Sequence, residues 1–138
     1  IDLFAGSGAL GLEAISRGAA YCLFVEEAAR ARAAIRENIE ALGLYGQTRI
    51  HRRSATALGK IPASAGGPFN IAFLDAPYGK GFSEPALTGL HAGEWLEPDA
   101  VCVVEQGIKE TPAVSASFTE LDRRVFGDTQ IGILRYSP

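Results

Sequence analysis

The sequence predicts an α/β fold in which a doubly wound, mostly parallel, seven-stranded sheet ends in an antiparallel C-terminal hairpin. Short apolar runs typical of buried strands alternate with segments of helical periodicity along the whole chain. A glycine-rich turn joins the first strand to the first helix, and Gly127-Asp128 separates the last two strands. We expect strands at residues 1–4, 21–25, 47–53, 70–74, 100–105, 118–126 and 130–136.

Helices are expected where apolar residues recur every three or four positions, which places them on one face of a helix. Gly43 stands where a left-handed residue ends the second helix, and Ser83 is expected to cap the start of the third. The predicted helices cover residues 9–17, 28–42 and 83–90. The strand at 47–53 mixes polar with apolar side chains, so we expect it at the edge of the sheet.

Composition predicts one globular domain over residues 1–138. The chain has 13 Lys+Arg and 16 Asp+Glu, a net charge of −3, and 47% hydrophobic residues, which excludes a disordered chain. No apolar run is long enough for a membrane-spanning helix. Cys22 and Cys102 each lie within an apolar run, which predicts two buried thiols in a reducing cytoplasm. The weak acidity disfavours a nucleic-acid binder that relies on bulk charge.

The start of the chain lacks Met and opens in the middle of a strand at Ile1. We therefore expect an N-terminal segment to precede residue 1. Any targeting signal, and any basic nucleic-acid-binding part, would lie in that segment.

The turn Gly6-Ser7-Gly8-Ala9-Leu10-Gly11 matches G-x-G-x-x-G after a strand and before a helix, which is typical of nucleotide binding. Glu26 ends the next strand, where a carboxylate can accept both hydroxyls of a ribose. Asp2 would repel a pyrophosphate but suits the ammonium of a methionine moiety, which favours S-adenosylmethionine (SAM) over NAD. No Gly-Lys-Ser/Thr follows, so a P-loop is excluded. The alternative is a tight turn beside a surface glutamate.

The second motif is Asp75-Ala76-Pro77-Tyr78, which follows the fourth strand. An exocyclic amine on a planar base has two N–H donors and an aromatic face. The Asp75 carboxylate and the Ala76 carbonyl match the two donors, and the Tyr78 ring matches the face. The alternative is an Asx-type turn that ends the strand, with Tyr78 as a covering side chain.

Together the two motifs resemble the Asp/Asn-Pro-Pro-Tyr class of SAM-dependent amino methyltransferases, which have a Rossmann-like sheet. More narrowly, the stretch from Asp2 to Ala20 is similar to the bacterial 16S rRNA guanine-N2 methyltransferase family that modifies G966 of the small subunit. Comparable runs in that family match Phe73-Leu74-Asp75, Trp95-Leu96 and Val103-Val104-Glu105.

The resemblance implies methylation of guanine N2 in small-subunit rRNA, with SAM as the methyl donor. It implies that SAM is bound by Asp2, Phe4, Ala5, Gly6, Gly8, Glu26, Ser54 and Ala55. It implies that the target amine meets Asp75, Ala76, Pro77 and Tyr78. The partner would be ribosomal RNA or an assembling small subunit, bound by a cytoplasmic monomer without membrane contact. An upstream basic hairpin and helix would contact the RNA.

This chain departs from the family pattern at two positions. Ala76 replaces a proline, but the expected acceptor is a backbone carbonyl, so we expect activity to be retained with a looser loop. Pro77 still restricts the backbone of Ala76 to extended conformations. Ser54 stands where related enzymes often have Asp, and it is equally compatible with a plain helix N-cap.

The only dense basic run is Arg49, His51, Arg52 and Arg53, which suits either an RNA contact or a solvated sheet edge. His51 and His91 have no Cys or carboxylate partners at metal-binding spacing, so no metal site is predicted.

Three other functions remain open at this point. A DNA adenine-N6 methyltransferase shares both motifs, although nothing after Tyr78 is long enough for a separate target-recognition region. An NAD-dependent oxidoreductase shares only the glycine-rich turn. A non-catalytic Rossmann-like binding module is the third, and it would be favoured if the missing N-terminal segment proved short and uncharged.

Overall fold

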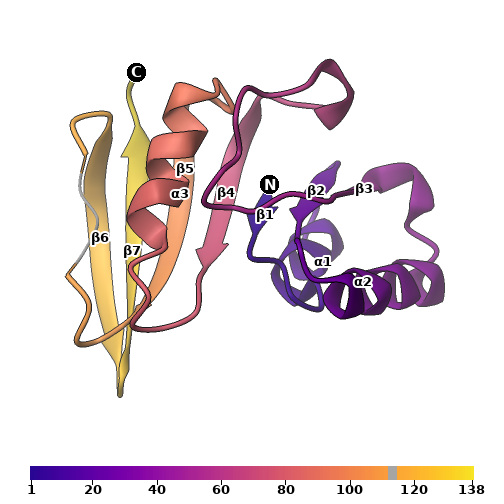
Figure 1. The fold of residues 1–138 in the computed structure, drawn as a ribbon, viewed down its shortest axis with the longest axis horizontal. Helices are drawn as coiled ribbons and strands as arrows, with labels where there is room; N and C mark the ends of the chain where they lie inside the picture. Colours follow the sequence, from indigo (N-terminus) through magenta and orange to yellow (C-terminus); the bar gives the residue numbers. More distant parts are fainter. Residues whose placement is uncertain (112–114) are drawn as a thin grey trace.

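The computed structural model describes residues 1–111 and 115–138, which form a seven-stranded sheet with the order β3-β2-β1-β4-β5-β7-β6 (Figure 1). The strands β1 to β5 are parallel, and β7 runs antiparallel between β5 and β6. The predicted fold class and the hairpin are therefore confirmed. The elements are β1 (Asp2–Leu3), α1 (Ala9–Ser16), β2 (Cys22–Val25), α2 (Ala29–Leu42), β3 (Thr48–His51), β4 (Phe69–Asp75), α3 (Ser83–Ala92), β5 (Leu96–Gly107), β6 (Phe118–Phe126) and β7 (Thr129–Tyr136).

The strand β2 is buried on both faces, and its alternate side chains enter different cores. Cys22 and Phe24 pack with residues of α1 and α2, including Ile35. Leu23 and Val25 belong to a second cluster, which contains the buried face of α3 and the central strands. Figure 1 shows α1 and α2 beside β1 and β2, whereas α3 lies against β4 and β5. Continuous apolar runs such as 22–25 are thus explained by burial on both sides.

Two local predictions need correction. Ser83 does not cap α3, because Phe82 occupies the cap position with a helical backbone and no side chain bonds to the helix end. Ser83 is instead buried within the first turn. The strand β5 is much longer than the predicted 100–105, because it pairs with β4 on one side and β7 on the other. The edge position of β3 and the left-handed Gly43 after α2 are confirmed.

The strand order reverses between β1 and β4, which lie side by side although two other strands separate them in the chain. Ligands of open α/β sheets bind beyond the carboxyl ends of the strands at such a switch point. Both sequence motifs follow strands that end there. Within residues 1–111 and 115–138, no helix is long and apolar enough to cross a membrane.

Candidate active site

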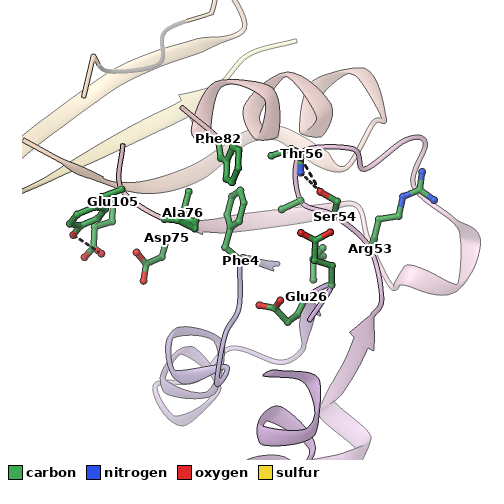
Figure 2. Close-up of a pocket in the computed structure, with 14 residues that line it drawn as sticks. Phe4, Glu26, Arg53, Ser54, Thr56, Asp75, Ala76, Phe82 and Glu105 are labelled. Atoms are coloured by element: carbon green, nitrogen blue, oxygen red, sulfur yellow. Dashed lines mark hydrogen bonds between the residues drawn. The ribbon is translucent and has the colours of Figure 1, made fainter. Parts of the chain in front are cut away.

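A cavity of about 480 Å³ opens at this switch point, beyond the carboxyl ends of β1, β2, β4 and β5 (Figure 2). It brings together residues from both sequence motifs. Of the predicted site residues, Phe4, Glu26, Ser54, Ala55, Asp75, Ala76, Pro77 and Tyr78 line it. The predicted residues Asp2, Ala5, Gly6 and Gly8 do not. Figure 2 shows Glu26 and Asp75 on opposite sides of the Phe4 side chain.

Asp2 faces the inside of the protein, contrary to the expectation that its carboxylate points into the cleft. Its side chain is buried, and Oδ2 accepts a hydrogen bond from the Gly11 backbone N–H at 3.1 Å. Burial raises the pKa of Asp2 to about 7, although the Gly11 bond opposes that shift. The physical reason is its place on the central strand β1, between β2 and β4 and beneath the start of α1. Asp2 therefore holds the glycine-rich turn from behind.

The glycine-rich turn uses its own amides to hold its shape. The Gly6 N–H donates to Glu26 Oε1 at 2.9 Å, and the Gly8 N–H donates to the Ala5 carbonyl at 2.8 Å. Phe4, Gly6 and Gly8 all have positive φ angles, of 57°, 59° and 81°. A positive φ is unfavourable for a phenylalanine and ordinary for glycine. The turn coils back toward the end of β2, and it leaves only the Phe4 side chain in the cavity wall.

Glu26 follows directly after β2 and lines the cavity. One carboxylate oxygen accepts from Gly6, and the other accepts from the Ala28 N–H at 3.0 Å. A carboxylate oxygen has two lone pairs, so each oxygen can still accept one more hydrogen bond. The two hydrogen bonds from the backbone fix the orientation of the Glu26 carboxylate, which can accept hydrogen bonds from two hydroxyl groups.

Ser54 and Ala55 form the wall after β3. The Thr56 backbone N–H donates to Ser54 Oγ at 3.3 Å, and the two hydroxyls of Ser54 and Thr56 lie 2.9 Å apart. No helix begins at Ser54, so the N-cap interpretation is wrong and the residue forms a hydroxyl-stabilised turn instead. Ala55 is buried and contributes an apolar surface to the cavity.

An aromatic pair that the sequence reasoning missed crosses the middle of the cavity. The rings of Phe4 and Phe82 are stacked, with centroids 6.3 Å apart and planes 5° from parallel. Figure 2 shows the two rings next to each other. Phe82 arrives from the segment before α3, which contains the positive-φ residues Gly79 and Gly81. The sequence signal was weak, because nothing local indicates that a phenylalanine in this segment meets one in the glycine-rich turn.

The second motif meets a further carboxylate that the predicted site did not include. Asp75 ends β4 and is the register partner of Glu105 on β5. Burial, followed by a hydrogen bond with Glu105 and its negative charge, raises the pKa of Asp75 to about 7. Tyr78 donates its hydroxyl to Glu105 Oε2 at 3.2 Å, and the hydroxyl lies 2.8 Å from Thr129 Oγ1. A signal was present, since Glu105 ends an apolar run just as Glu26 does.

The basic run is split between different environments. Arg53 lines the cavity and donates from Nε to the Ala57 carbonyl at 2.8 Å, and Figure 2 shows its guanidinium directed away from Asp75. Arg49 and Arg52 are exposed along the edge strand. Among the described residues, no group of three or more His, Cys, Asp or Glu side chains is arranged to hold a metal ion.

The family described as "Conserved hypothetical protein 95" matches residues 1–135. The chain belongs to this family. Over 128 residues it is 34% identical to Ribosomal RNA small subunit methyltransferase D of Escherichia coli K12, covering 92% of this chain and 63% of that protein. Over 136 residues it is 31% identical to a Bacillus subtilis protein provisionally named rRNA methyltransferase YlbH, covering 98% of this chain and 74% of that protein.

Solved structures of members of the same fold agree with these matches. A Haemophilus influenzae protein provisionally named methylase HI0767 superimposes with a TM-score of 0.87 at 26% identity, covering 99% of this chain and 85% of that chain. An Escherichia coli protein provisionally named methyltransferase yhhF gives a TM-score of 0.84 at 30% identity, covering 99% and 74%. The family and the fold are those of methyltransferases, which implies SAM as the methyl donor.

Proposed function

We propose that this chain is the catalytic domain of a SAM-dependent methyltransferase that modifies the exocyclic N2 of a guanine in small-subunit (16S) rRNA. One observation carries the proposal: a single cavity contains both the carboxylate suited to a ribose, Glu26, and the amine-binding motif that begins at Asp75. The matched relative from Escherichia coli is named for small-subunit rRNA methylation. An oxidoreductase would leave the loop at 75–78 without a role.

The cavity fits SAM in size and in the chemistry of its walls. Its volume lies in the range of small-molecule sites. When bound, SAM supplies a methyl group made electrophilic by the adjacent sulfonium. In the proposal Glu26 accepts the ribose hydroxyls, while Phe4 and Ala55 contact the adenine. Ser54 lies beside that contact, and Asp2, Ala5, Gly6 and Gly8 hold Glu26 and Phe4 in place from behind the wall.

The residues after β4 orient the target base. The Asp75 carboxylate and the Ala76 carbonyl accept the two N–H groups of the amine, which directs the nitrogen lone pair out of the plane of these bonds. The Tyr78 ring stacks on the base, and its hydroxyl is restrained by Glu105 and Thr129. Pro77 limits the freedom of the loop. With SAM bound beside Glu26, Asp75 and the Ala76 carbonyl would keep the amine nitrogen oriented toward the methyl group that SAM would supply.

Ribosomal RNA or an assembling small subunit is the proposed partner, and a cytoplasmic monomer is the proposed form. The chain spans 63% of the Escherichia coli relative and 74% of the Bacillus relative. The net charge of the chain is only −3, and three of its carboxylates, Asp2, Glu26 and Asp75, lie at or behind the cavity. Binding of RNA by bulk charge is therefore not expected of residues 1–138.

The activity can be tested with SAM that carries a tritiated methyl group. The label is offered with assembled small subunits, naked small-subunit rRNA and DNA, and its position is located by nuclease digestion. We expect incorporation at one guanine of the rRNA. Incorporation at adenine in DNA, or no incorporation in any substrate, would overturn the proposal.

The role of Asp75 can be tested by Asp75→Ala. Loss of the acceptor should reduce methylation at least about 100-fold, because the amine is no longer oriented. SAM affinity, measured by calorimetry, should stay nearly unchanged. Asp122→Ala on β6 removes a carboxylate far along the sheet and serves as the matched control. Turnover that survives Asp75→Ala would refute the role.

A further inference from the structure

We infer that Glu105 selects guanine over the other amine-bearing bases, by accepting the ring N1–H while Asp75 accepts the adjacent amine. This specificity role rests on the proposed function and adds a residue to it. It concerns recognition of the base and not the chemistry of methyl transfer.

Position supports this role. Glu105 lies on β5 opposite Asp75 in the register of the sheet, so the two side chains leave adjacent parallel strands at the same level. Both line the cavity, at the end away from Glu26 (Figure 2). The Tyr78 hydroxyl donates a hydrogen bond to Glu105. This bond holds the carboxylate next to the ring that is proposed to stack on the base. Two acceptors therefore stand side by side next to the surface on which the base is proposed to stack.

Base chemistry then decides which base suits two adjacent acceptors. On the Watson–Crick edge of guanine the N2 amine is next to N1–H, so two neighbouring atoms are donors. In adenine and cytosine the amine is next to a ring nitrogen that carries a lone pair and accepts. An ionised carboxylate facing that lone pair leaves two acceptors without a proton between them, which is costly in a partly buried site. Guanine alone satisfies both Asp75 and Glu105.

The electrostatics of the site agree with this arrangement. The pKa of Asp75 is raised to about 7, first by burial and then by the hydrogen bond with Glu105 and its negative charge, so the charged form of Asp75 is disfavoured beside a second carboxyl group. A ligand with two adjacent N–H donors gives one hydrogen bond to each carboxylate and stabilises both charges. A ligand with one donor and one lone pair stabilises only one of them.

A change of base in the substrate tests this inference. 2-Aminopurine keeps the amine at position 2 but lacks the O6 carbonyl and has a lone pair at N1 in place of N1–H. Synthetic RNA with guanine or 2-aminopurine at the mapped nucleotide is ligated into small-subunit rRNA and assembled if the activity requires the particle. For the unmodified enzyme we expect kcat/KM to be at least about 100-fold lower for 2-aminopurine, because the Glu105 carboxylate then faces a lone pair.

Glu105→Gln is the decisive variant. The glutamine carbonyl can still accept from Tyr78, and its amide can donate to a ring lone pair. We expect kcat/KM for guanine to fall, and the ratio between guanine and 2-aminopurine to shrink at least about tenfold. Glu97→Gln makes the same chemical change at the exposed opposite end of β5, and should alter neither the ratio nor the rate. Unchanged SAM affinity in Glu105→Gln shows that the variant is folded.

The outcomes separate the two proposals. If the unmodified enzyme methylates guanine and Glu105→Gln lowers both substrates by the same factor, Glu105 only supports the structure and the specificity role is wrong, while the proposed function stands. If the unmodified enzyme methylates no guanine at all, the proposed function fails and the inference fails with it. A ratio that collapses only in Glu105→Gln supports both.

Discussion

Asp2 shows how one side chain can be placed in a motif for a reason other than ligand contact. The residue is 1% exposed, and its carboxylate accepts a hydrogen bond from the N–H of Gly11, in the first turn of α1. The motif pattern predicts an acidic residue at the cleft, whereas the structure turns the group inward to restrain the turn. The pKa of Asp2 is raised because burial disfavours the charged form of the carboxyl group. Asp75 has a raised pKa for a related reason, with Glu105 adding to the burial.

The cost of burying Asp2 predicts a pH dependence of stability. The pKa of Asp2 is about 7 in the folded state against an ordinary value of 3.8, so the folded state binds this proton more tightly between those values. The resulting stabilisation is fully present below pH about 4 and is lost as the pH rises through 7. In Asp2→Asn this titration is absent, so the stability of the variant relative to the natural chain should increase by at most about 4 kcal/mol from pH 4 to 8.

Denaturant unfolding at a series of pH values measures this difference. The exposed residue Asp99 supplies the control Asp99→Asn, whose stability relative to the natural chain should vary much less with pH. Parallel stability profiles for Asp2→Asn and the natural chain would contradict the assignment of the proton to Asp2.

The packing of α1 on β2 depends on a close approach that only glycine allows. A Cβ atom on Gly11 would lie 2.5 Å from Phe24 Cε1 and 2.6 Å from Cys22 Sγ. The third glycine of the motif therefore serves the contact between helix and strand. That contact in turn places the start of α1, and with it the N–H that Asp2 accepts, next to the candidate site.

Gly11→Ala should force α1 away from β2. We expect a loss of about 1–3 kcal/mol in the free energy of unfolding, together with weaker SAM binding, since the turn is displaced. Gly46→Ala provides a matched control, because a Cβ there meets no atom within 4 Å and the stability should change by less than about 0.5 kcal/mol. Denaturant unfolding measures both stabilities. Equal free energies of unfolding for the two variants would show that α1 can move away from β2 without loss of stability.

The whole molecule consists of two apolar layers joined by one sheet, and each layer contains one free cysteine. Cys22 lies in the layer with α1 and α2, and Cys102 lies in the layer with α3. Burial raises the pKa of each thiol to about 12, so neither forms the reactive thiolate readily. The expectation of two buried thiols is confirmed.

Thiol labelling can therefore report on the cooperativity of the fold. In native buffer at pH 8 both cysteines should react far more slowly than the exposed control created by Ser137→Cys. In mild denaturant we expect Cys22 and Cys102 to react at the same rate, because the layers share the central strands and unfold together. Rates that differ by more than about tenfold, determined by mass spectrometry, would indicate that one layer opens alone.

Periodicity and turn chemistry in the sequence determined the order of strands and helices, the doubly wound sheet and the residues on either side of the switch point. These features depend on neighbours in the chain, since burial on two faces produces continuous apolar runs and a left-handed residue ends a helix. Only the tertiary structure decided that Asp2 faces inward, that Phe82 stacks on Phe4, and that Glu105 stands beside Asp75. Each of these contacts depends on strand order and register, which bring together residues that are far apart in the chain. The sequence around one such residue does not indicate which distant residue it will contact.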